Sequence, residues 1–190
     1  MPTYPRLVLF PDRKLRRRAE SLPGSAFGTS TLRTYCQVLA NLLTSAERAH
    51  VLAATQVDLD PAWRVIAVSA ENGKSGVSIL CNPVVTNEGG GSLDFENSAS
   101  FACVPCQLSA PSKLTVEYRT PDGKARKVEC TRTGARAVFQ GVESLNGKII
   151  LDRMSAPAAL DYTRRYRQEL DERLVPEIFL PDEGVVTHLA

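Results

Sequence analysis

The sequence predicts an α+β fold with a single domain over residues 1–175 and an extended tail over residues 176–190. Amphipathic helical patterns lie in the first and last thirds of the chain, and alternating β patterns lie between them. The chain has no internal repeat and no linker-like stretch. Its 190 residues, of which 43% are hydrophobic, are enough to bury one core.

The first element is predicted to be a helix over residues 31–48, with Ser30 as its N-cap. Apolar residues recur there at three- and four-residue spacing, which places them on one face. These residues are Leu32, Tyr35, Cys36, Leu39, Leu42, Leu43 and Ala46.

Two buried strands are predicted next, over residues 63–69 and 77–81, because both runs are apolar and rich in β-branched residues. Asn82-Pro83 is expected to end the second strand, which Val84-Val85 can resume. Residues 86–98 contain three consecutive glycines among acidic and small residues, so a mobile surface loop is predicted there.

Residues 113–131 predict a β-hairpin, because two alternating runs flank the turn sequence Pro121-Asp122-Gly123. A helix is expected over 135–145, and then a short strand over 148–151. A highly charged surface helix is expected over 161–174, begun by Ser155 or Asp161. Pro176 then ends it.

Composition excludes several classes of protein. The apolar runs are far shorter than the ~20 residues of a membrane span, and the net charge of +2 shows no nucleic-acid footprint. Only two histidines are present, which removes most histidine-based metal chemistry. Five cysteines without regular spacing indicate a reducing compartment, and the N-terminal residues lack the features of a secretory signal. We expect a cytoplasmic or mitochondrial-matrix protein that is not secreted and does not bind membranes.

Two short segments carry residues that could do chemistry. Gln56 lies on a small-residue loop, from which its amide N–H could reach an oxyanion; taken alone, hydrogen bonding to local backbone is favoured. Cys103-Val104-Pro105-Cys106 could supply half of a zinc site or a redox pair. Neither histidine is paired with a further ligand, so packing cysteines are favoured.

The predicted helix over 135–145 is more informative. Gln140 and Ser144 are four residues apart and share a face, as two histidines do in many metallohydrolases. Neither side chain is a good ligand for zinc or iron. Gly141 inside a helix costs about 1 kcal/mol relative to alanine, so we interpret it as a tolerated irregularity at which the helix should accept glutamate.

Five short motifs also follow one another in a characteristic order. They are Leu9-Phe10-Pro11-Asp12-Arg13-Lys14-Leu15-Arg16, Leu52-Ala53-Ala54-Thr55-Gln56-Val57, Asn82-Pro83, Cys103-Val104-Pro105, and Leu145-Asn146-Gly147 with Leu151-Asp152-Arg153-Met154-Ser155. In order and spacing they resemble the bacterial type of peptide deformylase over about residues 6–174. The second resembles the end of that family's G-x-G-L-A-A-x-Q motif, and the last two follow the places of its E-G-C-L-S and Q-H-E-x-D-H motifs.

The resemblance implies a fold of small antiparallel sheets around a central helix, with further helices near both ends. It also implies removal of the formyl group from N-terminal formyl-methionine of nascent chains. In this family one cysteine and two histidines hold Fe²⁺ or Zn²⁺, a glutamate is the general base, and a glutamine with a backbone N–H stabilises the oxyanion. By resemblance, Gln56, Ala102 and Arg136 are the candidate substrate-binding residues.

Most of that machinery is substituted in this sequence. Phe101 stands at the metal cysteine, Gln140 and Ser144 stand at the two histidines, and Gly141 stands at the glutamate. Both glycines of the first motif are replaced, by Ala49 and Val51. Only Gln56 is retained, together with Glu143 at the aspartate position between the two histidines.

These substitutions predict a deformylase fold without a metal cofactor and without catalysis. Phe101 is expected to fill part of the vacated space, because Cys103 with Gln140 and Ser144 would be a poor ligand set. The alternative is a deformylase-type hydrolase with an atypical site.

The expected partners are peptide N-termini or a protein. RNA or ribosome contact through the arginines and tyrosines of residues 162–167 was weighed against a solvated helix face, and the solvated face is favoured.

Overall fold

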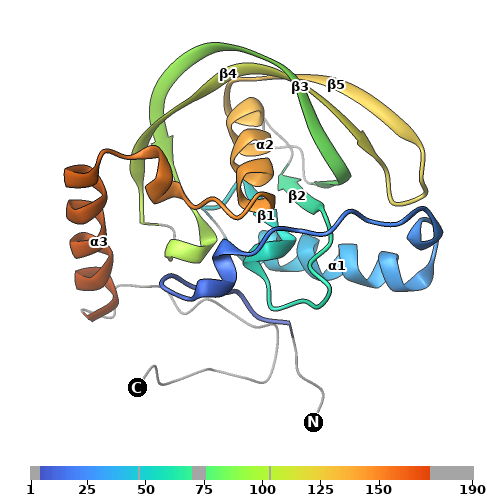
Figure 1. Cartoon of the computed structure of the whole chain (residues 1–190), viewed down its shortest axis with the longest axis horizontal. Helices are drawn as coiled ribbons and strands as arrows, with labels where there is room; N and C mark the ends of the chain where they lie inside the picture. The colour runs from blue at the N-terminus through green and yellow to red at the C-terminus, as the bar shows by residue number, and fades with distance from the viewer. Residues whose placement is uncertain (1–4, 47, 70–75, 103, 172–190) are drawn as a thin grey trace.

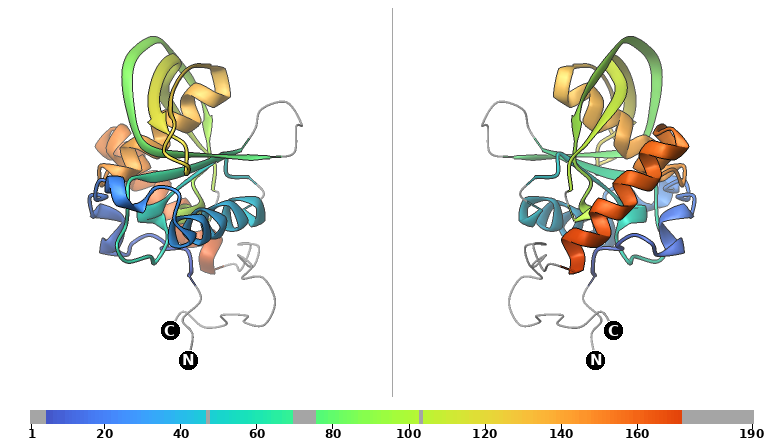
Figure 2. Two further views of the ribbon diagram at one scale, coloured as in Figure 1. Left: turned by 90° about the vertical axis from the view of Figure 1, so that its right-hand side faces the viewer. Right: turned by 90° about the vertical axis from the view of Figure 1, so that its left-hand side faces the viewer.

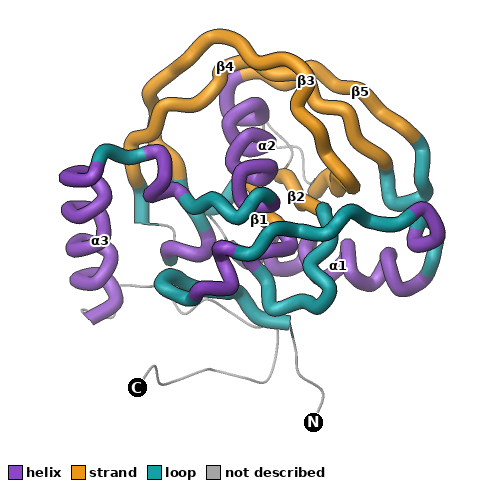
Figure 3. Tube along the Cα trace, in the orientation of Figure 1, coloured by secondary structure: helices purple, strands orange, loops and turns teal. Residues whose placement is uncertain are grey.

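The computed structural model describes residues 5–46, 48–69, 76–102 and 104–171 (Figures 1 and 3). Its helices are α1 (Ser30–Ser45), α2 (Arg132–Leu145) and α3 (Ala156–Asp171). Its strands are β1 (Val51–Ala53), β2 (Val65–Ser69), β3 (Val77–Glu96), β4 (Cys106–Arg119) and β5 (Ala125–Thr131). They form one antiparallel sheet in the order β1-β2-β3-β4-β5, which confirms the predicted α+β class.

All seven residues of the predicted apolar face are buried, six of them in α1 and the seventh, Ala46, directly after it. The N-cap of α1 is Thr29, whose Oγ1 accepts a hydrogen bond from the Leu32 N–H, so the predicted cap at Ser30 was one residue late. The helix ends at Ser45 instead of residue 48. The Ala46 N–H closes the last turn on the carbonyls of Leu42 and Leu43, and Ala46 itself leaves helical geometry.

Strands β1 and β2 carry a helix on each face. Leu52, Val65 and Ala67 pack in the core beneath α1, whereas Val51 and Ile66 pack in the core beneath α2. This alternation is the two-residue period of a strand, and it explains why the whole run over 65–68 is apolar. Helix α2 lies between this part of the sheet and the arch of β3 and β4 above it, which matches the predicted central helix (Figure 1).

Strand β3 corrects two predictions. It does not stop at Asn82-Pro83 but continues to Glu96, with a shift of register between Cys81 and Val84. Asn82 has a φ of +49°, and its side chain bonds both the N–H and the carbonyl of Leu22, which supports the irregularity. Proline is tolerated at such a shift because no ladder donor is needed there.

The predicted mobile loop over 86–98 is mostly strand. Gly89 pairs with Lys113, and Gly91 pairs with Pro111 of β4. Beyond Cys81, β3 pairs only with β4, so the two strands form a long curved ribbon over α2 (Figure 2). The three glycines therefore lie within a strand of this ribbon. The prediction of a loop was wrong, because it rested on the glycines and small residues of this segment.

The second half of the chain follows the prediction with smaller changes. The hairpin is present, with Val116 opposite Val128, and α2 begins three residues before the predicted start. Residues 148–151 do not form a strand; a 3-10 turn at Ile150–Arg153 takes their place, because the Asp152 carboxylate accepts the Ile149 N–H and closes the turn.

Of the two predicted starts for α3, Ser155 is right. The predicted end of this helix at 174 and the tail over 176–190 lie outside the described residues. No helix in the described part of the chain is long and apolar enough to span a membrane.

Candidate functional site

One face of α2 carries Arg136, Gln140 and Ser144 at intervals of four residues, as predicted. Gln140 is buried, and its Nε2 donates to the carbonyl of Asn97 at 3.2 Å. The carbonyl of Ser144 accepts a hydrogen bond from the Thr55 hydroxyl at 2.9 Å. We call this side of α2, with Gly141 next to it, the closed face, because protein groups cover it.

Gln56 ends a short 3-10 turn, Ala54–Gln56, and its side chain points into the protein. Its Oε1 accepts the Ala53 N–H at 2.9 Å. Its Nε2 donates to the hydroxyls of Ser98 at 3.3 Å and Ser100 at 3.1 Å. A primary amide has two N–H groups, so both donors that could reach a substrate are engaged within the chain.

The candidate backbone donor is engaged as well. Ala102 follows the 3-10 turn Ala99–Phe101 in a left-handed conformation, with φ at +50°. Its N–H donates to the carbonyl of Ala99 at 3.1 Å. Gln56 and Ala102 are therefore satisfied by their own neighbours, and neither has a free donor in this conformation.

Phe101 is 1% exposed and belongs to an aromatic cluster. Its ring stacks on Phe10 with 4.8 Å between centroids, and it contacts Tyr162 and Tyr166 of α3. The Tyr166 hydroxyl donates to the Phe10 carbonyl, and burial raises the pKa of Tyr166 to about 12. Both tyrosines are buried, so their rings are covered by the protein.

The structure brings Gln56, Phe101 and Ser144 to the wall of one small cavity, together with Ser98 and Ser100. The volume of this cavity is about 10 Å³. A cavity of that size holds about one water molecule. The side chains that line it therefore leave little open space.

Gly141 lies on the closed face where α2 approaches β1 and β2 most closely. A Cβ atom at this position would lie 2.8 Å from Cγ2 of Val51 and 3.1 Å from Cδ1 of Ile66. The sequence-based interpretation of Gly141 as a tolerated irregularity was wrong, because this contact requires glycine. A glutamate side chain at 141 would be directed into buried apolar residues, so the helix cannot accept it while Val51 is present.

Ala49, the other replaced glycine position, does not line the cavity. It is buried in the core beneath α1, and its N–H donates to the Ala46 carbonyl at 2.8 Å.

The residues present do not fit iron or zinc. The three positions that the resemblance assigns to ligands hold an aromatic ring, an amide and a hydroxyl, whereas these metals are held by thiolate, imidazole and carboxylate groups. Among the residues that the structure describes, no three histidine, cysteine, aspartate or glutamate side chains gather where they could hold a metal ion. Cys103 lies outside the described residues.

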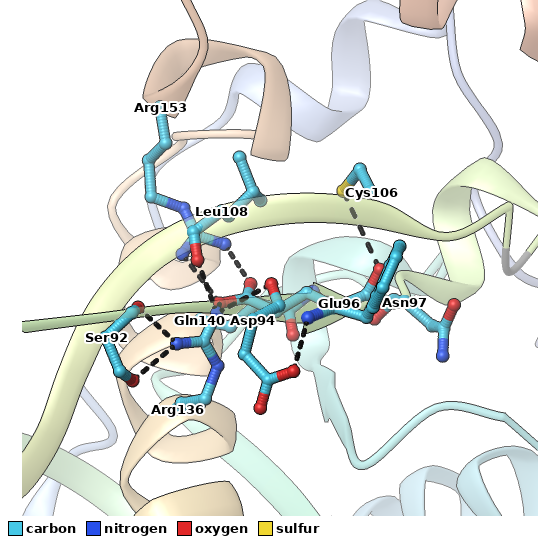
Figure 4. Close-up of polar contacts among 10 residues, drawn as sticks. Ser92, Asp94, Glu96, Asn97, Cys106, Leu108, Arg136, Gln140 and Arg153 are labelled. Atoms are coloured by element: carbon cyan, nitrogen blue, oxygen red, sulfur yellow. Dashed lines mark hydrogen bonds and ion pairs between the residues drawn. The ribbon is translucent and has the colours of Figure 1, made fainter.

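Arg136 is held in a buried ionic network (Figure 4). Its Nη2 lies 2.7 Å from Oε1 of Glu96, and Arg153 pairs with the other carboxylate oxygen of Glu96. Further Arg136 N–H groups donate to the carbonyls of Ser92 and Leu108. The Arg136 side chain is 6% exposed, so here it joins α2 to the β3–β4 ribbon.

Glu96 was not among the predicted site residues, because its segment was predicted to be a loop. Residues 92–96 alternate polar and apolar side chains, and this alternation was the available signal for a strand. The burial of these side chains is the reverse of the usual pattern, because Leu93 and Phe95 are exposed whereas Glu96 is buried against Arg136. Hydrophobicity would therefore have pointed to the wrong face.

Cys106 begins β4 and is buried, with its Sγ 3.6 Å from the Glu96 carbonyl. Burial, with the nearby Glu96 charge, raises the pKa of the Cys106 thiol to about 11, so it stays protonated at neutral pH. This environment favours the packing role over a zinc or redox role.

Comparisons with known proteins place the chain in a family. A family model described as "Polypeptide deformylase" matches residues 5–159. A peptide deformylase from Stenotrophomonas maltophilia (strain R551-3) is 27% identical over 149 residues, covering 78% of this chain and 86% of that protein. A peptide deformylase from Picosynechococcus is 25% identical over 157 residues, covering 82% of each.

Solved structures show the same fold. A peptide deformylase from Legionella pneumophila superimposes with a TM-score of 0.77 at 19% identity, covering 90% of this chain and 98% of that one. The peptide deformylase from Thermus thermophilus gives a TM-score of 0.74 at 22% identity, covering 87% of this chain and 95% of that one. The family model matches most of the sequence, and the resemblance inferred from the short motifs is confirmed. The chain belongs to the polypeptide deformylase family.

Proposed function

We propose that this chain is a non-catalytic member of the deformylase family, with a structural or protein-binding role in place of deformylation. The observation that carries the proposal is the content of the former centre. Phe101, Gln140 and Ser144 occupy the three ligand positions, and the cavity lined by Phe101 and Ser144 measures about 10 Å³. The proposal thus rests on which side chains are present and on the space they leave.

The contact between Val51 and Gly141 supports the same proposal. The general base of the family would have to extend from position 141, and a Cβ there already lies 2.8 Å from Val51. The internal hydrogen bonds of Gln56 and Ala102 agree with this, since these groups would otherwise hold the substrate carbonyl. A closed cavity also favours a structural role over the binding of peptide N-termini.

The direct test measures metal content and formate release together. Protein purified without chelator should contain far less than one equivalent of iron or zinc by elemental analysis. It should also release no formate from a formyl-methionyl peptide, with or without added Fe²⁺ or Zn²⁺. Tightly bound metal near one equivalent, or formate release that scales with protein concentration, would overturn the proposal.

A positive control comes from the chain itself. A variant that carries Phe101→Cys, Gln140→His, Gly141→Glu and Ser144→His together with Val51→Gly should bind one divalent metal. The same set without Val51→Gly should lose stability, because the glutamate and the valine compete for one space. Metal binding by the five-substitution variant would show that the assay detects this site when its ligands are restored.

The second candidate function is a deformylase-type hydrolase with an atypical site. Two observations favour it: the similar proteins named above are peptide deformylases, and Gln56 is retained beside the serine hydroxyls of the cavity. If this candidate is right, the wild-type chain releases formate and Gln56→Ala reduces the rate. If the non-catalytic proposal is right, neither protein gives a signal above buffer.

A further inference from the structure

A second hollow lies on a different face of α2. Its apolar floor is formed by Val84 and Val85 of β3 with Phe139 and Val142 of α2, and its volume is about 290 Å³. On α2 the lining residues are spaced by three and four positions, so they form one face. We call this the groove face. It shares no residue with the cavity beside Gln56.

Arg64 lies in the wall of this groove. Its Nη1 donates to Oδ1 of Asn146 at 3.0 Å, and a guanidinium has five N–H donors in all. Within the described part of the chain, Arg64 forms no ion pair with a carboxylate. Burial and the nearby positive charge of Arg18 lower the pKa of Arg64, which indicates a partly desolvated cation beside a second cation.

Two carboxylates also line the groove, and among the described residues neither forms an ion pair with Arg64. Glu143 pairs with Lys148, with 2.9 Å between Oε2 and Nζ. Glu88 lies on an exposed part of β3. The groove therefore combines an apolar floor, which includes the 56% exposed Val84, with a cation that has no anionic partner among the described residues.

We infer that this groove binds a small apolar ligand that carries one carboxylate, with the carboxylate on Arg64 and the apolar body over Val84, Val85 and Phe139. A guanidinium matches a carboxylate in geometry and charge, and a floor formed by the exposed Val84 with the half-buried Val85 and Phe139 gains free energy when it is covered. The C-terminal residue of a peptide and a free short-chain fatty acid share this chemistry. The inference does not rest on the proposed function, because it uses none of the degenerate site residues.

The test uses the full-length, ¹⁵N-labelled protein and three probes: N-acetyl-leucyl-leucine, its C-terminal amide, and octanoate. At millimolar ligand, the dipeptide acid or octanoate should shift the amide signals of Val84, Val85 and Val142 and leave those of Gln56 and Ser100 unchanged. Binding of the dipeptide acid alone identifies a peptide C-terminus as the ligand, and binding of octanoate alone identifies a free fatty acid. The amide should bind at least about tenfold more weakly than the acid, since it lacks the charge-assisted contact.

Two variants locate the site. Arg64→Met removes the charge and keeps an apolar stem, and it should weaken binding of the acid by at least about tenfold. Val84→Glu places a like charge at an exposed position and should weaken binding without loss of fold. Arg126→Met, at an exposed arginine of β5, is the matched control and should bind normally. Equal binding of acid and amide, unchanged binding in Arg64→Met, or no shifts at millimolar ligand would each overturn the inference.

Discussion

The closed face and the groove face belong to the same helix, yet they differ in how much space they leave. On the closed face the cavity measures about 10 Å³, and the side chains of Arg136 and Gln140 bond to protein groups. On the groove face the hollow measures about 290 Å³ and Arg64 has no carboxylate partner among the described residues. The comparison teaches that the side chains at the family's site positions leave far less space than the side chains of the groove face.

The largest expected effect comes from a carboxylate placed on each face in turn. Gly141→Glu should destabilise the protein by about 4 kcal/mol or more, because it both overpacks the core and buries an unpaired charge. Val142→Glu, one residue later and half-buried, should cost only about 1 kcal/mol. Urea unfolding of both variants measures the difference. Equal losses would mean that the two faces are equally packed.

Adding Val51→Gly to Gly141→Glu sharpens this result. The double variant should be more stable than the sum of the single effects predicts, by about 1–3 kcal/mol, since the two residues are in contact. A double-mutant cycle from urea unfolding gives this coupling. Additive effects would contradict the assignment of Val51 as the residue that closes the space at 141.

The next effect in size concerns the ionic network that anchors the closed face. Glu96→Gln leaves Arg136 and Arg153 without their counterion and should cost about 3–5 kcal/mol. The matched change on the groove face, Glu143→Gln, removes a partly exposed ion pair with Lys148 and should cost no more than about 1 kcal/mol. Thermal unfolding at neutral pH compares the two, and a Glu96→Gln variant as stable as Glu143→Gln would rule out an anchoring role.

The smallest effect is a loss of stability in alkali. Burial raises the pKa of Tyr166 from 10.0 to about 12, so between these pH values the folded protein holds a proton that the unfolded chain releases. Stability from this group is therefore complete below pH 10 and decreases as pH rises, by about 1 kcal/mol at pH 11. Tyr166→Phe should show a shallower decrease between pH 9 and 11 than wild type, and Tyr35 should account for part of what remains. If stability decreased with pH equally in wild type and Tyr166→Phe, the pKa of Tyr166 would not be raised by burial.

The sequence predicted the elements whose pattern matches their burial. The helix that became α1 and the hairpin of β4 and β5 follow regular periods, and both are present. Strand β3 was divided in error, because local signals at Asn82-Pro83 and at the glycines favour a break. What keeps β3 continuous is its pairing with β4, and this long-range contact has no local signature.

For the site, the sequence showed which residue types occupy the family's positions but not what they contact. Gln140 and Ser144 share a face, as their spacing indicated, and Phe101 lines the cavity. The spacing could not show that Gln56 bonds to Ser98 and Ser100, because these segments are about forty residues apart in the chain. Helix propensity describes the α2 segment by itself, so it could not show that Gly141 lies against Val51 of β1.

If the chain is non-catalytic, as proposed, the contact between Val51 and Gly141 also bears on whether deformylase chemistry can arise in it by mutation. A reversion at 141 alone inserts a side chain into occupied space, and a reversion at 51 alone leaves a void and a glycine in a buried strand. Each first step lowers stability and restores no metal ligand, so neither intermediate offers an advantage on which selection could act. Under that proposal, the Val51–Gly141 pair blocks a stepwise path to the family's reaction, because both positions must change together.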